Sequence, residues 1–257
     1  MRAMLWGALL VIGTSMPFDA QAAEPRDARL YELRVYTAAE GKLDALHARF
    51  RDHTCKLFEK HGMTNVGYWV PQENPEQKLY YVLSYADRPA RNKAWAAFMA
   101  DPDWRAVYTA SEKEGKLTSK VESQFLDATD FSPAITPGVS KEPRVFELRT
   151  YTCTPGNLDR LQARFRDHTC KLFEKHGMTN WAYWTLVKGQ PAADDTLIYL
   201  LAHPSKEACA ASFAAFREDP DWQKAKAASE AATGGSLTAP DGVKSLILVA
   251  TDYSPTK

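Results

Sequence analysis

Hydrophobic and polar residues follow two different periods along the first third of the chain, and each period predicts an element. Over 30–37 the sequence LYELRVYT alternates with the two-residue period of a strand. Over 39–61 apolar residues fall at helical spacing, and the run ends at Gly62, a residue suited to a left-handed helix cap. Two aromatic and β-branched runs, 64–70 and 79–85, flank a turn-rich stretch and predict a hairpin.

A second helical region and a last strand follow the hairpin. Residues 88–100 have helical spacing, and Asp101 and Pro102 then restart a helix with an acidic N-cap and a proline in the first turn. A strand over 119–129 closes the pattern. The order β-α-β-β-α-β is that of a ferredoxin-like unit, a four-stranded sheet with both helices on one side.

The whole pattern occurs twice. Residues 48–65 read ARFRDHTCKLFEKHGMTN, and residues 163–180 repeat these letters without a change. The pairs AFMADPDW with AFREDPDW, and ATDFSP with ATDYSP, extend the match to about 110 residues per copy, the size of a whole small domain. We therefore predict a duplicated domain rather than an array of short repeats.

These patterns predict an α+β protein with two tandem ferredoxin-like units, the first at 28–130 and the second at 144–254. A segment with several prolines, 131–143, forms the predicted linker. Each unit leaves one face of its sheet without a helix, and that face needs cover. The open faces of the two units can pack on each other, which predicts an internal pseudo-dimer with the form of a closed barrel.

The first 23 residues have the pattern of a signal peptide. An apolar run, Leu5–Ile12, precedes the small-x-small sequence AQA at 20–22, which is typical of signal-peptidase sites. The run is too short for a permanent membrane anchor, and no later segment is long enough to span a bilayer. We expect a signal peptide at 1–23, export to the periplasm or the medium, and no stable membrane span after cleavage; an uncleaved N-terminal anchor is the alternative.

Charge and cysteine content exclude some classes of partner. The 32 basic and 32 acidic residues balance, so the chain lacks the basic surplus that nucleic acid binding requires. The four cysteines show no CxxC or Cys/His metal spacing, and we predict no metal site. Cys153 and Cys209 occur only in the second copy, where a bridge between them is open beside the alternative of four thiols.

The polar face of the first strand is the first candidate site. In each copy it carries an acid, an arginine and a tyrosine: Glu32, Arg34 and Tyr36, and Glu147, Arg149 and Tyr151. Since the opposite apolar face is the better candidate to pack on the helices, we expect these residues to point into the assembled barrel or cleft. They could bind an acidic or polar aromatic ligand, or position it for proton transfer. The pattern favours the simpler interpretation, a structural ion pair that joins the two sheets.

The long helix carries the second candidate. His53 and His168 lie on its apolar stripe, so each is expected to face the sheet or its edge rather than open water. A hydrogen-bonded structural histidine is the favoured interpretation. A general base or an axial ligand to haem is the alternative.

Aromatic residues on the two middle strands are the third candidate. Tyr68, Trp69, Tyr183 and Trp184 alternate along these strands, so half of them should point to each face of the sheet. Some would then line whatever the barrel encloses and favour a flat or apolar ligand. Simple filling of the pseudo-dimer core is an equal alternative.

These residues together resemble the NIPSNAP family. Each copy has (Y/F)ELR-x-Y, a glycine at Gly41 or Gly156 starting the long helix, HGM before the second strand, YW within it, and DPDW in the second helix. The resemblance implies the dimeric α/β-barrel superfamily, in which two ferredoxin-like units build one barrel, here within a single chain. That superfamily includes haem-degrading monooxygenases, cofactor-free quinone-forming monooxygenases and haem peroxidases.

Two functions stay open. The first is an exported, noncatalytic protein that needs no cofactor and binds a small aromatic or apolar ligand, or mainly serves as an assembly surface. The second is a monooxygenase-type enzyme, cofactor-free or haem-linked. There the arginines and tyrosines of the first strands would hold the substrate, and His53 and His168 would move a proton or ligate haem. A homo-oligomer of the two-domain chain is compatible with either.

Overall fold

The computed structural model describes residues 27–257, so the predicted signal peptide at 1–23 lies outside the described residues. The first copy contains β1 (Leu30–Ala38), α1 (Leu43–Arg49), the π-helical turn η1 (Phe50–Thr54), α2 (Cys55–Lys60), β2 (Thr64–Pro71), β3 (Lys78–Tyr85), α3 (Arg88–Ala100), α4 (Pro102–Ser111) and β4 (Thr118–Ala128). The second contains β5 (Val145–Cys153), α5 (Leu158–Arg164), the π-helical turn η2 (Phe165–Thr169), α6 (Cys170–Lys175), β6 (Thr179–Leu186), β7 (Thr196–His203), α7 (Lys206–Glu218), α8 (Pro220–Ala231) and β8 (Thr238–Ala250).

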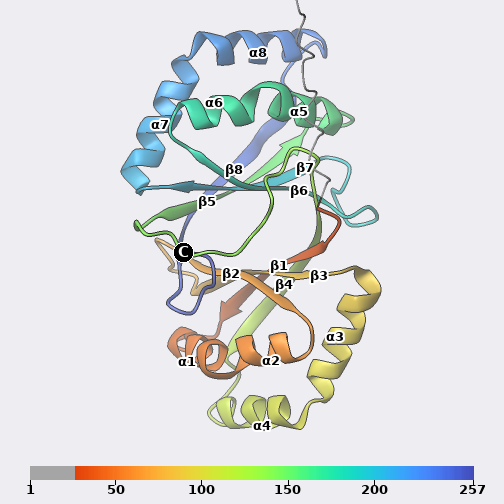
Figure 1. Ribbon diagram of the computed structural model, residues 1–257, viewed down its shortest axis with the longest axis vertical. Helices are drawn as coiled ribbons and strands as arrows, with labels where there is room; N and C mark the ends of the chain where they lie inside the picture. The colour runs from red at the N-terminus through yellow and green to blue at the C-terminus, as the bar shows by residue number, and fades with distance from the viewer. Residues whose placement is uncertain (1–26) are drawn as a thin grey trace, which may run out of the picture.

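The strands form one closed antiparallel barrel in the order β1-β3-β2-β8-β5-β7-β6-β4. Each copy supplies four neighbouring strands, and two seams join the copies. At one seam Trp69 of β2 pairs with Ala250 of β8, and at the other Leu126 of β4 pairs with Leu186 of β6. The structure therefore confirms two ferredoxin-like units that build an intramolecular barrel, with the sheets facing each other and the helices outside (Figure 1).

The barrel interior is a packed apolar core. Side chains from both copies fill it, including Tyr31, Leu33, Trp69, Trp181 and Trp184. The remaining cavity among them measures about 10 Å³, which is room for about one water molecule. Within residues 27–257, this space among the barrel side chains is too small for a ligand, so a ligand in the barrel interior is not supported.

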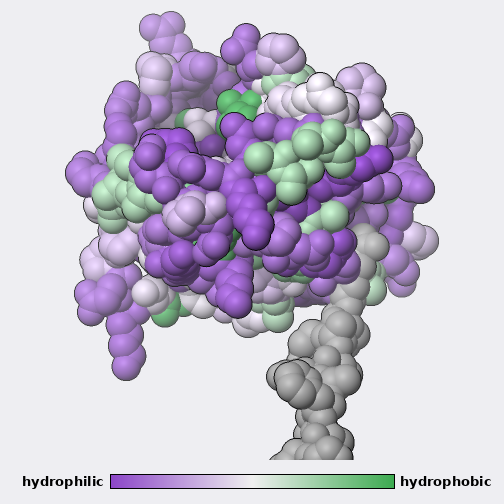
Figure 2. All heavy atoms as spheres, turned by 90° about the horizontal axis from the view of Figure 1, so that it is seen from above, coloured by the Kyte–Doolittle hydropathy of each residue, from purple (hydrophilic) through white to green (hydrophobic). Residues whose placement is uncertain are grey.

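The helices of each copy cover the outer face of their own sheet. Their apolar sides form a second core in the first copy and a third in the second, centred on Phe58 and Phe173. Their outer sides are polar, and Figure 2 shows a largely hydrophilic surface over the helices of the second copy. None of the helices within 27–257 has the length and apolar content needed to cross a bilayer.

The repeated sequences ATDFSP and ATDYSP fasten each copy to the other. Thr129 donates its backbone N–H to Tyr183 of β6 at 2.9 Å, and Thr251 donates to Tyr68 of β2 at the same distance. The side chain of Ser254 then accepts a bond from the Tyr68 N–H at 2.9 Å. The segment after the last strand of each copy therefore contacts the other copy, which explains why this sequence occurs in both.

Candidate functional site

The polar face of β1 points toward the helices of its own copy. Glu32 and Arg34 lie opposite Leu83 and Tyr81 of β3, which belong to the core between sheet and helices. The equivalent strand β5 has the same orientation. The expectation that these residues face the barrel interior is therefore wrong. A charged side chain in the barrel interior would meet only the apolar side chains of the surrounding strands. On the outer face of the sheet, the helices supply partners for the charge, such as Arg91 for Glu32.

Glu32 is the central acceptor of the first copy's site, and its side chain is fully buried. Its Oε1 accepts hydrogen bonds from Arg34 Nη1 at 2.5 Å, Ser123 Oγ at 2.7 Å and Arg91 Nη2 at 2.8 Å. Its Oε2 accepts from Tyr85 OH and from Arg91 Nε, both at 2.9 Å. One carboxylate therefore holds two guanidinium groups, and this cluster has a surplus of one positive charge.

The pKa of the Glu32 carboxyl is lowered to about 2. Burial opposes its ionisation, but the hydrogen bond from Arg91 and the charge of Arg34 outweigh burial. The carboxyl is therefore ionised at neutral pH and keeps both arginines in place.

Arg34 links this acid to phenols and to an indole. Its Nε donates to Tyr81 OH at 2.9 Å, and its Nη2 donates to Tyr36 OH at 3.3 Å. Its guanidinium carbon lies 4.4 Å from the ring centroid of Trp95 on α3, within cation–π range. These contacts fix the guanidinium group beside Tyr36.

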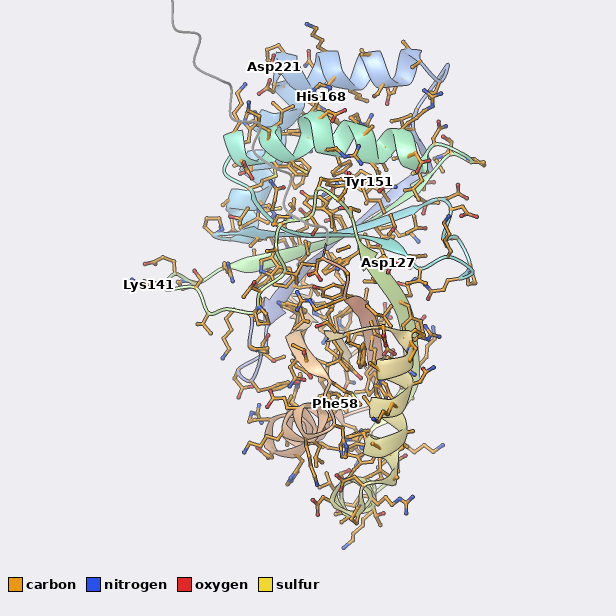
Figure 3. The ribbon with its side chains drawn as sticks, turned by 45° about the vertical axis from the view of Figure 1, so that its right-hand side comes forward. Phe58, Asp127, Lys141, Tyr151, His168 and Asp221 are labelled. Atoms are coloured by element: carbon orange, nitrogen blue, oxygen red, sulfur yellow. The ribbon has the colours of Figure 1, made fainter. Side chains whose placement is uncertain are left out.

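A cavity of about 250 Å³ lies between the sheet and the helices of the first copy. It is lined by Arg34 and Tyr36 from β1, by Arg49 from α1, and by the aromatic residues Phe50, Phe58, Trp95, Phe98, Trp104 and Tyr108. Figure 3 labels Phe58 in this layer between sheet and helices. A cavity of about 150 Å³ can hold benzene, so this one has the size for a small aromatic molecule. We call it the β1 cavity.

The β1 cavity has an apolar mouth and a buried arginine. Met99, Tyr108 and Val121 line it and are 54%, 43% and 46% exposed. Arg49 is buried, and its Nη1 donates to Glu112 at 3.2 Å, whereas its Nε has no hydrogen-bond partner. An aromatic ligand with an anionic group fits this combination of apolar entrance, aromatic walls and unused donor.

His53 and His168 are exposed, so the expectation that they face the sheet is wrong. The π-helical turns η1 and η2 are the reason. A π turn contains more residues than an α turn, so Thr54 occupies the buried position, and its hydroxyl donates a hydrogen bond to the Arg49 carbonyl oxygen at 3.0 Å. Figure 3 shows His168 in the helical layer of the second copy, apart from Tyr151. The structure brings neither histidine to the arginine and tyrosine of its copy.

The aromatic residues of β2 and β6 divide between the two faces, as predicted. Tyr68 and Tyr183 pack under the helices, whereas Trp69 and Trp184 fill the barrel. None of the four lines the β1 cavity. They act as core residues on both sides of the sheet.

The second copy repeats the polar triplet. Arg149 donates Nη1 to Glu147 at 2.5 Å and Nη2 to Tyr151 OH at 3.2 Å. Its guanidinium carbon lies 4.5 Å from the ring of Phe213, which replaces Trp95.

The surroundings of the second triplet differ from those of the first. Arg217 and Lys226 stand at the positions of Met99 and Tyr108, so two cations replace the apolar mouth. Cys209 stands at the position of Arg91, so the surplus arginine is missing. The two sites are therefore not equivalent, and the first is better suited to an aromatic anion.

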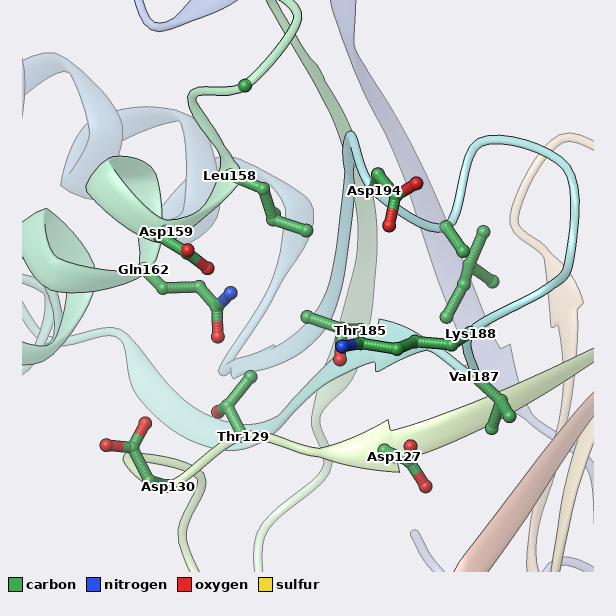
Figure 4. Close-up of a pocket in the computed structure, with 13 residues that line it drawn as sticks. Asp127, Thr129, Asp130, Leu158, Asp159, Gln162, Thr185, Val187, Lys188 and Asp194 are labelled. Carbon is green, nitrogen blue, oxygen red and sulfur yellow. The ribbon is translucent and has the colours of Figure 1, made fainter.

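A larger cavity of about 800 Å³ opens where α5 begins, beside the β6–β7 loop (Figure 4). Its charged lining residues are Asp127, Asp130, Asp159, Asp194 and Lys188. It contains no aromatic residue and none of the predicted site residues. Because acidic groups dominate this wide opening, we take the β1 cavity as the candidate site.

Sequence reasoning missed several residues of this site. Arg91 and Trp95 come from α3, whose helical pattern gave no sign of a link to β1. Arg49 could have been noticed, because it lies three residues after Leu46 on the buried stripe of the long helix. The four cysteines are unpaired in the structure, so the bridge between Cys153 and Cys209 does not form. Cys209 lies beside Glu147 and His203.

Fold and site together define a dimeric α/β-barrel protein that builds both halves of the barrel within one chain. The NIPSNAP family model matches residues 31–133 and 146–255, once per copy, and the chain belongs to the NIPSNAP family. No curated protein matches it.

Solved structures with the same fold have little sequence in common with this chain. A proposed monooxygenase from Lactobacillus acidophilus NCFM is 11% identical with a TM-score of 0.53, over 87% of this chain and 94% of that one. Another from Fusobacterium nucleatum subsp. nucleatum is 10% identical with a TM-score of 0.54, over 87% and 92%. An anthrone oxidase-like protein is 12% identical with a TM-score of 0.57, over 90% and 95%. Identity this low shows the fold alone.

Proposed function

We propose that the protein binds a small aromatic anion in the β1 cavity. The observation that carries this proposal is a 250 Å³ cavity in which the buried arginines Arg34 and Arg49 meet walls of aromatic side chains. The ring of the ligand lies among Phe50, Trp95 and Trp104, and its carboxylate or phenolate faces the guanidinium groups.

Charge balance supports an anionic ligand. Glu32 carries one negative charge against the two positive charges of Arg34 and Arg91, while Arg49 is paired with Glu112. An anion would neutralise the surplus and supply an acceptor to Arg49 Nε. Hydrogen bonds to charged groups are worth about 1.5–3 kcal/mol each, so the anionic group should add at least about tenfold in affinity.

The test is a titration of the mature chain with 1-naphthoate, benzoate and neutral naphthalene. Calorimetry and tryptophan fluorescence report binding, because Trp95 and Trp104 line the cavity. We expect saturable binding of an aromatic carboxylate at one site per chain, and weaker binding of naphthalene.

The repeat provides a matched control. Arg34→Met should reduce the preference for the carboxylate, since Arg49 remains in the cavity, and Glu32 keeps Arg91 as a partner in this variant. Arg149→Met makes the same change in the second copy and should leave binding unchanged. Equal loss in both variants, or no binding by any member of the panel in folded protein, would refute the proposal.

A second candidate function is cofactor-free oxidation of a phenolic aromatic compound. It is favoured by the position of Arg34 beside Tyr36, where a guanidinium group would stabilise the anion of an acidic phenol or anthrone. The named relatives of the same fold include an anthrone oxidase-like protein. In this reaction a CH₂ group becomes a carbonyl: it takes one oxygen atom from O₂, and its two hydrogens leave with the other oxygen atom as water.

Oxygen consumption with anthrone tests this second function. Activity that is lost in Arg34→Met and kept in Arg149→Met would support it. Binding of anthrone without oxygen uptake would refute the oxidation and support ligand binding as the function.

A further inference from the structure

The glutamate that both copies share on their first strand has different partners in the second copy. Glu32 is surrounded by Arg91 and Tyr85, whereas Glu147 meets Cys209 and His203 at the equivalent positions of α7 and β7. Each replacement exchanges a hydrogen-bond donor for a side chain that can ligate a metal.

Glu147, His203 and Cys209 are fully or nearly fully buried, at 2%, 1% and 5% exposed. One potential ligand atom from each lies within 4.8 Å of the others. Ligand atoms around a tetrahedral zinc ion lie about 3.5 Å apart, as metal distances of about 2.0–2.3 Å require. Side-chain shifts of about 1 Å therefore suffice to close the cluster around an ion.

Unused polar atoms point to a missing occupant. Neither ring nitrogen of His203 has a hydrogen-bond partner, and Oε2 of Glu147 has none. His203 Nε2 lies 3.4 Å from this Oε2 without the geometry of a hydrogen bond. Buried polar atoms normally have partners, and in the first copy both oxygens of Glu32 are used.

The two oxygens of Glu147 have separate tasks. Oε1 accepts bonds from Arg149 Nη1 at 2.5 Å and from Ser245 Oγ. Oε2 has no well-aligned hydrogen bond and faces His203 Nε2 at 3.4 Å, while Arg149 and Ser245 hold the carboxylate in place, as outer partners of metal ligands do.

We propose that Glu147, His203 and Cys209 form a buried site for one transition-metal ion of the zinc type. A sulfur, an imidazole nitrogen and a carboxylate oxygen together suit zinc or cobalt rather than magnesium or calcium, which prefer oxygen ligands. Three protein ligands leave one position open. This site is separate from the β1 cavity and does not depend on the proposed function.

Metal binding requires the thiol to lose its proton. Burial raises the pKa of the Cys209 thiol to about 12, and the negative charge of Glu147 acts in the same direction. The thiol is therefore protonated without metal, and uptake of an ion should release a proton.

The experiment is a cobalt and zinc titration of the metal-free mature chain. We expect one ion per chain and a thiolate-to-cobalt charge-transfer band that zinc removes. The variant Cys209→Ser should lose this band, and its affinity should fall by more than about tenfold. The matched control is Cys153→Ser, which removes another buried thiol of the same copy and should leave cobalt binding unchanged.

A second variant guards against a failure to fold. His203→Tyr combined with Cys209→Arg recreates the residues around Glu32 in the first copy, so it should fold without binding cobalt. The proposal is refuted if the folded wild-type chain takes up no stoichiometric metal, or if bound cobalt shows no thiolate band. It is also refuted if the double variant binds as tightly as the wild type.

Discussion

At the scale of single residues, one glutamate position supports two different environments. Glu32 binds two arginines and Glu147 binds one, although the strand around each has nearly the same sequence. The difference comes from α3 and α7, where Arg91 is replaced by Cys209. Different residues at a few contact positions therefore give Glu32 a second arginine and surround Glu147 with potential metal ligands.

The buried Glu32 predicts how stability depends on pH. Its folded pKa of about 2 lies below the ordinary value of 4.5, so the ion pairs stabilise the fold above about pH 4.5 and lose this effect as the pH falls toward 2. Glu32→Gln should lower the free energy of unfolding by roughly 3 kcal/mol at pH 7, and the difference from wild type should shrink in acid.

Denaturant unfolding between pH 2 and pH 7 measures this difference. Glu122→Gln is the control, since Glu122 pairs with Lys120 at the surface and its removal should change the free energy by less than about 1 kcal/mol. A pH-independent difference for Glu32→Gln would contradict the argument.

At the scale of elements, periodicity predicted which strands and helices form but not where their polar faces point. Polar and apolar residues alternate clearly along β1, but an apolar layer lies on each side of this strand: the barrel interior on one side and the helices on the other. Only the closed barrel decides between them, because its interior has no partner for a charge. The π turn η1 could not be predicted either. If the helix were α-helical throughout, its periodicity would place His53 on the buried side, whereas Thr54 is the residue buried there.

At Gly67 in β2, the structure leaves no room for a side chain. The ring of Trp69 lies over it, and a Cβ atom at this position would come within 2.1 Å of the ring. Trp69 is buried in the barrel and cannot move freely, so Gly67→Ala should destabilise the fold by about 1–3 kcal/mol.

The second copy supplies the control for this variant. Ala182 stands at the position of Gly67, so its barrel already accommodates a methyl group there. Ala182→Gly should cost only about 0.5–1 kcal/mol, through backbone entropy. Equal unfolding midpoints for Gly67→Ala and wild type would show that Trp69 has room to shift.

At the scale of the whole molecule, one chain supplies both halves of a barrel that neither four-stranded sheet could close alone. The two seams, β2 with β8 and β4 with β6, close the barrel, and the segments after β4 and β8 cross to the other copy. The family resemblance and the internal repeat were enough to predict this assembly. They could not predict that the barrel is filled, because packing depends on how side chains of both copies combine.

Export is a further prediction about the whole chain. The apolar run and the AQA sequence before Ala23 predict cleavage by signal peptidase. Mass spectrometry of the protein from its native host should find an N-terminus near Ala23 or Glu24 in an exported fraction. Retention of residues 1–22 would favour the anchored form.

Complementary side-chain volumes predict how separated halves would assemble. Val66 in the first copy corresponds to Trp181 in the second, and both belong to the barrel core. Each half alone exposes the apolar face of its sheet and should dimerise through the seam strands. A homodimer of the second half would place two indoles where the native barrel holds one indole and one valine, so its core would be overpacked. A homodimer of the first half would place two valines there and leave a void.

Mixed halves should therefore prefer the heterodimer. Native mass spectrometry of halves 24–143 and 144–257, prepared separately and then combined, measures the three species. Val66→Trp in the first half is the control and should remove the preference, because it makes this position alike in both halves. Folded monomeric halves, or homodimers that persist in the mixture, would show that the barrel core does not select the partner.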